Sequence, residues 1–240
     1  MNESTRWRKL IVLVAAVVAM AVTARLGWWQ LGRAASKTEL ATQLERRSAQ
    51  PMLSAAEALV LPIADVHHRP VRLTGHWVPE ATVFLDNRPM QGRAGFVVVT
   101  PLRLAGRQET VLVQRGWVPR DFQDRTRLPA LQTPATEVTV LGTVAPPPAQ
   151  LYAFDNGSVG PIRQNIDISA YGLETGLSLA AWSVLQTGPQ DLQFLRAWPK
   201  PGVDVSKHHG YAFQWFALCA LIGLLYVWFQ LIAPRRARQS

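Results

Sequence analysis

The sequence predicts an α+β membrane protein in which two transmembrane helices flank an extracytoplasmic, antiparallel β-rich domain. Two apolar runs, residues 10–31 and 211–233, each reach roughly the 20 residues that cross a bilayer. Between them, short stretches rich in Val, Thr, Leu and aromatic residues are separated by Gly, Pro and Asn, which is typical of strands. We therefore expect a sheet curled into a barrel or a sandwich between the two spans.

The first apolar run predicts a retained transmembrane helix. Residues 10–24 are unbroken, and the run continues past Arg25 to Trp28 and Trp29, whose rings favour the headgroup level. A cleaved signal peptide is the alternative, because a short basic lead precedes the run and small residues stand near Ala24. Arg25 lies in the outer third of the helix, where it must snorkel to the interface or face an anionic partner.

The second run has aromatic residues at both ends and an aliphatic centre, which predicts a helix anchored at two membrane interfaces. The full division of the chain then follows from these runs. We expect a tail at 1–9, a span at 10–32, an outer domain at 33–207, a second span at 208–233 and a basic tail at 234–240.

The charge distribution predicts topology and not nucleic-acid binding. Six basic residues flank the two runs and Glu3 is the only acid in either tail, so the tails carry more than half of the net charge of +9. The basic residues concerned are Arg6, Arg8, Lys9, Arg235, Arg236 and Arg238. Short basic flanks stay in the cytoplasm, so both termini are expected inside and the central domain in the periplasm. The first span begins near Leu10 without a long presequence, which favours a bacterial inner membrane over a mitochondrial one.

The composition of the central domain excludes several classes of site. The only cysteine, Cys219, lies in the second run, so the domain has no disulfide, Cys-based zinc site or iron–sulfur cluster. No Gly-x-Ser-x-Gly, phosphate-loop, His-Glu-x-x-His or dinucleotide motif occurs. His76, with Asp86 or Glu80, is a thin candidate for a hydrolase. We expect a protein that is not an enzyme.

The local patterns predict the elements of the outer domain. Residues 36–47 extend the first span as a helix, and residues 54–59 and 168–175 form short helices. The predicted strands are 70–77, 82–86, 95–104, 110–118, 137–144 and 183–186, and the predicted loops are 121–134 and 145–164.

Three polar motifs in this domain favour structural roles. His67 and His68, adjacent on a strand, would point to opposite faces, which favours a surface or strand-end role over a shared metal. Arg88 lies in a turn sequence, Asp-Asn-Arg-Pro, which favours a solvated side chain. Arg115 closes a Val-rich strand, where it could pair structurally or present its cation to an indole face.

His208 stands at the start of the second span. On a helix, the residues that share its face are Tyr211, Ala212, Trp215 and Cys219. An imidazole at the membrane boundary followed by aromatic rings could be an axial ligand with rings to stack on a porphyrin. The alternative is an interfacial histidine on an ordinary packing face, and physical chemistry alone favours it.

Four blocks, in order along the chain, resemble the Surf1 family. They are Gly27-Trp28-Trp29-Gln30 with Arg33 and Lys37; Leu85-Asp86-Asn87-Arg88 with residues 95–102; Val113-Gln114-Arg115-Gly116-Trp117-Val118; and His208 with Tyr211-Ala212-Phe213-Gln214-Trp215-Phe216. Gln114 stands where Asn is commoner in the family, and Lys207 replaces an Asn often found before the histidine. Together the blocks span nearly all of the chain.

The resemblance implies an assembly factor for haem-copper cytochrome c oxidase that acts while haem a is placed in subunit I. Implied partners are subunit I, other assembly factors and membrane lipid, with haem a synthase as a further candidate. The family's haem-ligating histidine corresponds to His208. We hypothesise that Tyr211 and Trp215 contact the ring and that Arg33 or Arg25 neutralises a propionate. The alternative is a haem-free scaffold that stabilises an oxidase assembly intermediate.

If the predicted topology holds, the first-span block Trp29-Gln30-Arg33 and the second-span block led by His208 both fall at the extracytoplasmic boundary. The two blocks could therefore line one site.

Overall fold

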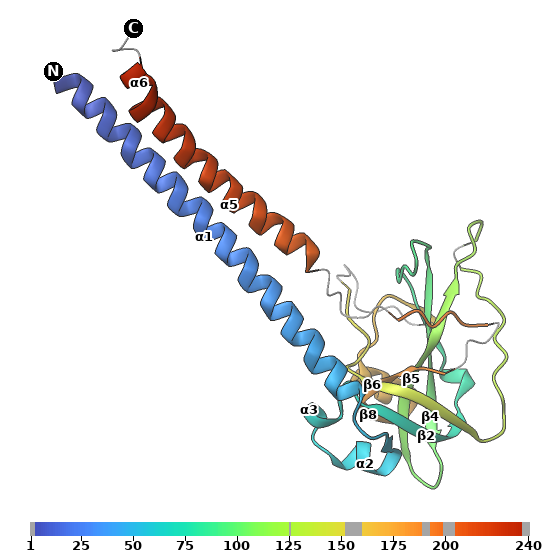
Figure 1. The fold of residues 1–240 in the computed structure, drawn as a ribbon. Coiled ribbons are helices and arrows are strands. Elements are labelled where there is room, and N and C mark those ends of the chain that lie inside the picture. The colour runs from blue at the N-terminus through green and yellow to red at the C-terminus, as the bar shows by residue number, and fades with distance from the viewer. Residues whose placement is uncertain (1–2, 125, 152–159, 189–192, 199–204, 237–240) are drawn as a thin grey trace. The chain divides into compact units, whose positions relative to one another are not determined.

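The chain forms two compact units. A computed structural model of the protein describes residues 3–124, 126–151, 160–188, 193–198 and 205–236. One unit comprises Met1–Gln43 with Lys200–Ser240, and the other comprises Leu44–Pro199. The first is helical and the second is built around a sheet (Figure 1). Part of the predicted loop at 145–164, and Arg238 of the basic tail, lie outside the described residues.

The helical unit contains two helices that are long and apolar enough to cross a membrane. They are α1 (Glu3–Ser48), whose last five residues are counted with the sheet unit, and α5 (Ser206–Val227). A π-helical turn, η2 (Trp228–Ile232), and α6 (Ala233–Arg236) continue the second helix. Large apolar side chains along both helices stay exposed, as lipid-facing residues do. The 46 residues of α1 measure about 69 Å along the axis, so the helix continues well past a bilayer core of about 30 Å. The predicted helical extension at 36–47 is confirmed.

The sheet unit is a closed barrel. An eight-stranded sheet has the order β1-β2-β6-β8-β5-β4-β3-β7, with an additional pairing of β2 and β4. That pairing closes a ring of five strands, β2, β6, β8, β5 and β4, in the described part of the chain. The strands are β1 (Leu53–Ser54), β2 (Pro70–Trp77), β3 (Val83–Leu85), β4 (Gly95–Leu104), β5 (Glu109–Pro119), β6 (Val138–Ala145), β7 (Ile162–Arg163) and β8 (Ser178–Gln186). Closure of the ring removes most of the exposed sheet edge.

The barrel confirms the predicted β-rich domain, but its sheet is not purely antiparallel. The pairs β1–β2, β3–β7 and β5–β8 are parallel. A parallel pair needs a crossover connection, and α4 (Ile168–Thr175) lies on the connection that leads into β8. Strand β8 also begins at Ser178, earlier than the predicted residue 183, because Ser178 and Leu179 pair with Glu109 and Thr110 at the start of β5.

Two of the short helices were predicted from local sequence patterns, and two other short elements were not. Helix α2 (Ala55–Val60) follows its N-cap Ser54, whose side chain forms a capping box with Glu57, and α4 has the bounds predicted for it. Asp167 caps α4 by accepting from the Ala170 amide at 2.8 Å, and Gly176 ends the helix with φ of 67°. The four-residue helix α3 (Ile63–Val66) and the 3₁₀ turn η1 (Pro79–Ala81) were not predicted.

The core occupies both faces of the central strands. One buried cluster takes residues from all five ring strands, among them Leu73, Leu102, Val113, Val140 and Val184. A second cluster on β4 and β5, with Leu112 and Trp117, is covered by Tyr171 of α4. Strands buried on both faces appear in a sequence as continuous apolar runs, which is how β4 and β5 look.

Candidate functional site

Helices α1 and α5 lie side by side and run antiparallel (Figure 1). One stripe of α5 makes the contact: His208, Ala212, Phe216, Cys219 and Gly223 recur at helical spacing. Opposite this stripe, α1 presents small residues and backbone. The ring of Phe216 packs against Gly27, and the Cys219 thiol donates to the Met20 carbonyl oxygen at 3.4 Å. Small residues allow such close approach between helices in a membrane.

His208 meets Gln30 at one end of this stripe. The distance from His208 Nδ1 to Gln30 Oε1 is 2.8 Å, and both side chains are half-buried. With its proton on Nδ1, the imidazole donates to the carboxamide oxygen, and Nε2 keeps the lone pair that a metal would take. A histidine oriented in this way by its other nitrogen is the usual arrangement at haem and metal sites.

The remaining predicted site residues lie off the contact stripe. Tyr211 is 52% exposed and Trp215 is half-buried. Arg25 and Arg33 are exposed on α1, where Arg25 lines a shallow groove with Val22, Leu26, Trp28 and Trp29. The structure thus brings His208 to the first-span block through Gln30, to which the sequence had given no separate role. The contributions of Tyr211, Trp215, Arg25 and Arg33 stay predictions.

Comparison with known proteins gives the family. The model of the SURF1 family matches residues 17–220, which include both Gln30 and His208. The chain belongs to the SURF1 family. Over 228 residues it is 23% identical to a SURF1-like protein of Rickettsia bellii, covering 91% of this chain and 88% of that protein.

Two further SURF1 relatives extend the comparison to eukaryotes. A SURF1-like protein of Drosophila melanogaster is 25% identical over 90% of this chain and 75% of its own length. The cytochrome oxidase assembly protein SHY1 of Saccharomyces cerevisiae is 29% identical over 61% of this chain, which corresponds to 39% of that protein. The likeness to the Rickettsia and Drosophila proteins therefore includes both long helices and the barrel.

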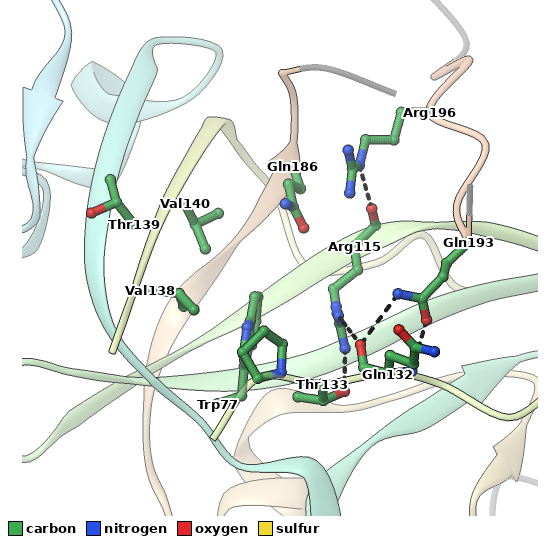
Figure 2. A pocket seen from close by; sticks show the side chains of 11 residues that line it. Trp77, Arg115, Gln132, Thr133, Val138, Thr139, Val140, Gln186, Gln193 and Arg196 are labelled. Atoms are coloured by element: carbon green, nitrogen blue, oxygen red, sulfur yellow. Dashed lines mark hydrogen bonds between the residues drawn. The ribbon is translucent and has the colours of Figure 1, made fainter. Parts of the chain in front are cut away.

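The barrel of this SURF1 protein contains a cluster of polar side chains around Arg115, separate from the contact between His208 and Gln30 (Figure 2). The Arg115 guanidinium lies over the rings of Trp77 and Phe194, at 4.8 and 4.7 Å from their centroids. It donates to Thr133 Oγ1 at 2.7 Å and to the Gln132 carbonyl oxygen at 3.3 Å, beside a cavity of about 560 Å³. Both roles that the sequence left open are present, since the side chain holds residues 132 and 133 of the loop that precedes β6 and also faces an indole.

The histidine pair lies between α3 and β2, not on a strand. His67 ends α3, and His68 has a φ of 65°. Burial lowers the pKa of both imidazoles, and the nearby Arg47 cation lowers it further. In the described ranges, no three His, Cys, Asp or Glu side chains are grouped so that they could hold a metal ion.

Two other predictions concerned the environment of Arg88 and a candidate hydrolase site. The Arg88 side chain, expected in solvent, is half-buried and donates to two main-chain carbonyls, because the loops around residues 149 and 164 fold over it. His76 and Glu80 are exposed, and Asp86 pairs with Arg120 at 3.5 Å. Within the described residues, no hydrogen bond joins any two of His76, Glu80 and Asp86, which were the weak candidates for a hydrolase site.

Proposed function

We propose that this chain is an assembly factor for haem-copper cytochrome oxidase, and that it binds haem a through His208 while the cofactor is placed in subunit I. Membership of the SURF1 family and the name of the yeast relative support the assembly role. The contact between Gln30 and His208 is the observation that carries the haem proposal.

The residues around His208 fit an axial haem site. Gln30 holds Nδ1 at 2.8 Å, which leaves Nε2 as the nitrogen that would meet iron. Trp215 and Tyr211 follow on the same helix with rings that can contact a porphyrin edge, and Arg25 and Arg33 on α1 supply cations for propionates. The bound group would supply the iron centre destined for the oxidase, and the chain would supply orientation and charge.

The proposed topology places this site at the periplasmic boundary of a bacterial inner membrane, with both termini in the cytoplasm. The basic flanks of the two spans support this orientation. Subunit I, which receives haem a, is the proposed partner, together with other assembly factors and haem a synthase as a source of the haem. In this role the protein is a chaperone and carries no catalytic step of its own.

The experiment is an absorption spectrum of the detergent-purified protein, co-expressed with a source of haem a. His208→Ala is compared with the wild type and with His209→Ala, the exposed neighbour on the same helix turn. We expect a haem band in the wild type and in His209→Ala, and its loss in His208→Ala.

Two results would contradict the proposal in different ways. A band of unchanged position and intensity in His208→Ala would remove this histidine as the ligand. If no sample carried haem while oxidase subunits still co-purified, haem binding would be wrong and the haem-free scaffold would stand.

A further inference from the structure

A second cavity lies in the barrel unit, away from the Arg115 group. It measures about 280 Å³ and has mostly apolar walls. The wall residues that matter here are Leu85, Met90, Val97, Leu151, Leu185 and Trp198, and Arg88 and Gln114 also line it. A concave apolar site with one or two convergent polar groups is the usual form of a small-molecule site.

Arg88 is held in this cavity by contacts from several parts of the chain. Its Nη2 donates to the carbonyl oxygens of Ala149 and Gln164, at 2.6 and 2.9 Å. Its own carbonyl oxygen accepts from Trp117 Nε1 at 2.7 Å. The guanidinium is therefore fixed by main-chain groups and cannot turn freely into solvent.

The charge of Arg88 has no counter-ion among the described residues. No described carboxylate lies within 4.0 Å of it, and neighbouring Asp86 pairs with Arg120 instead. Arg88 Nε is buried and has no hydrogen-bond partner among the described residues. Burial lowers the pKa of Arg88, but an arginine remains protonated, so these surroundings leave a cation that an anion would stabilise.

We propose that this cavity binds a small monocarboxylate, with the carboxylate on Arg88 and an apolar body against Trp198, Leu185 and Leu151. A carboxylate accepts charge-assisted hydrogen bonds from a guanidinium, and these are roughly twice as strong as hydrogen bonds between neutral groups. Asn87 and Gln114 are the other polar side chains of the wall, and the Gln114 amide already donates to Ser183, so Arg88 is the one cation among the described lining residues. One cation matches the single charge of a carboxylate better than the double charge of a phosphate. At about 30 Å³ for each water-sized group, the cavity has room for about nine or ten non-hydrogen atoms.

This site is independent of haem binding, because every residue of the cavity belongs to the Leu44–Pro199 unit, whereas Gln30 and His208 belong to the helical unit. Loss of haem in a His208 variant would leave the monocarboxylate site intact. Failure of either proposal is therefore visible separately.

The test uses phenylacetate as the probe and the full chain in nanodiscs, followed by saturation-transfer NMR with empty nanodiscs subtracted. Phenylacetamide is the neutral probe of the same size. We expect saturable binding of phenylacetate and at least about tenfold weaker binding of phenylacetamide. Arg88→Gln should weaken phenylacetate binding by at least about tenfold, and Arg72→Gln, an exposed arginine on β2, should change it by less than about twofold.

A second variant keeps the test decisive if Arg88→Gln does not fold, as judged by near-UV circular dichroism. Leu185→Phe adds volume to the cavity wall without altering Arg88, and it should weaken phenylacetate binding by about tenfold or more. Absence of saturable binding to the wild type, equal binding of the two probes, or unchanged affinity in a folded Arg88→Gln or in Leu185→Phe would overturn the proposal.

Discussion

The helix pair and the barrel contain the same apolar side chains in opposite environments. Leu224 on α5 is 68% exposed, whereas Leu112 on β5 is fully buried. A helix satisfies its backbone hydrogen bonds internally, so in lipid it can expose its leucines and needs only a narrow contact stripe. Strands satisfy theirs only with neighbours, so the barrel must close and fill its centre. The exposed apolar side chains of the helix pair therefore suit a lipid environment, and the buried ones of the barrel suit an aqueous environment.

The polar contacts differ in the same way. In the helix pair, the contact of His208 with Gln30 stands at one end of a small and apolar stripe, along which the Cys219 thiol makes only a weak hydrogen bond to the Met20 carbonyl oxygen. In the barrel, the guanidiniums of Arg88 and Arg115 are fixed by main-chain carbonyls and a hydroxyl. The barrel thus uses polar contacts to hold loops, and the helix pair places one at a position suited to a ligand.

The largest expected difference in stability between the two regions comes from a Leu→Ala substitution made once in each of them. Leu112→Ala should lower the free energy of unfolding of the barrel by about 2–5 kcal/mol, because it leaves a cavity in a packed core. Leu224→Ala should change it very little, since that side chain faces outward. Hydrogen exchange of the full chain in detergent, read on the β4 and β5 amides, measures both. Equal loss of protection in the two variants would contradict the comparison.

A smaller difference is expected between two glycines. A Cβ at Gly75 on β2 would overlap the Arg103 carbonyl oxygen of the paired strand, so Gly75→Ala should destabilise the barrel by about 1–3 kcal/mol or more. At Gly27 the new methyl would lie 2.7 Å from Cζ at the far end of the Phe216 side chain, which can move aside by a small change of χ1, so Gly27→Ala should change helix-pair stability by less than about 1 kcal/mol. Thermal unfolding of both variants in detergent tests this order, and a more damaging change at Gly27 would reverse it.

The smallest effect concerns the pH dependence of the barrel. Burial lowers the pKa of His68 below its ordinary value near 6.5, so below that pH the unfolded chain binds a proton that the folded chain resists. Stability should therefore fall as the pH drops from about 7 towards 5. His68→Asn, which tolerates the φ of 65°, should reduce this slope. Urea midpoints at several pH values measure it, and an unchanged slope in His68→Asn would contradict the argument.

Most of the fold was predictable because its signals are local. The apolar runs, the alternation in β2 and the capping residues around α4 are each contained in a few neighbouring positions. The parallel pairing of β5 with β8 was not predictable from such signals, because it depends on where a long connection returns the chain. Two-residue strands such as β1 and β7 carry no periodicity at all.

The candidate sites show the same limit more sharply. The position of His208 at the start of an apolar run made it a candidate from sequence, but its partner Gln30 lies 178 residues away. Arg88 looked solvated because a turn motif says nothing about the loops that cover it at residues 149 and 164. Contacts between distant segments decide both sites, and a single sequence does not contain them.

The most direct test of the account is a haem a titration of the detergent-purified wild type, His208→Ala, Gln30→Leu and Arg88→Gln. We predict that His208→Ala loses binding, that Gln30→Leu binds about 10- to 100-fold more weakly because the imidazole is no longer oriented, and that Arg88→Gln binds as the wild type does. Wild-type affinity in His208→Ala, or a loss in Arg88→Gln as large as the one predicted for His208→Ala, would contradict the assignment of haem to the helix pair.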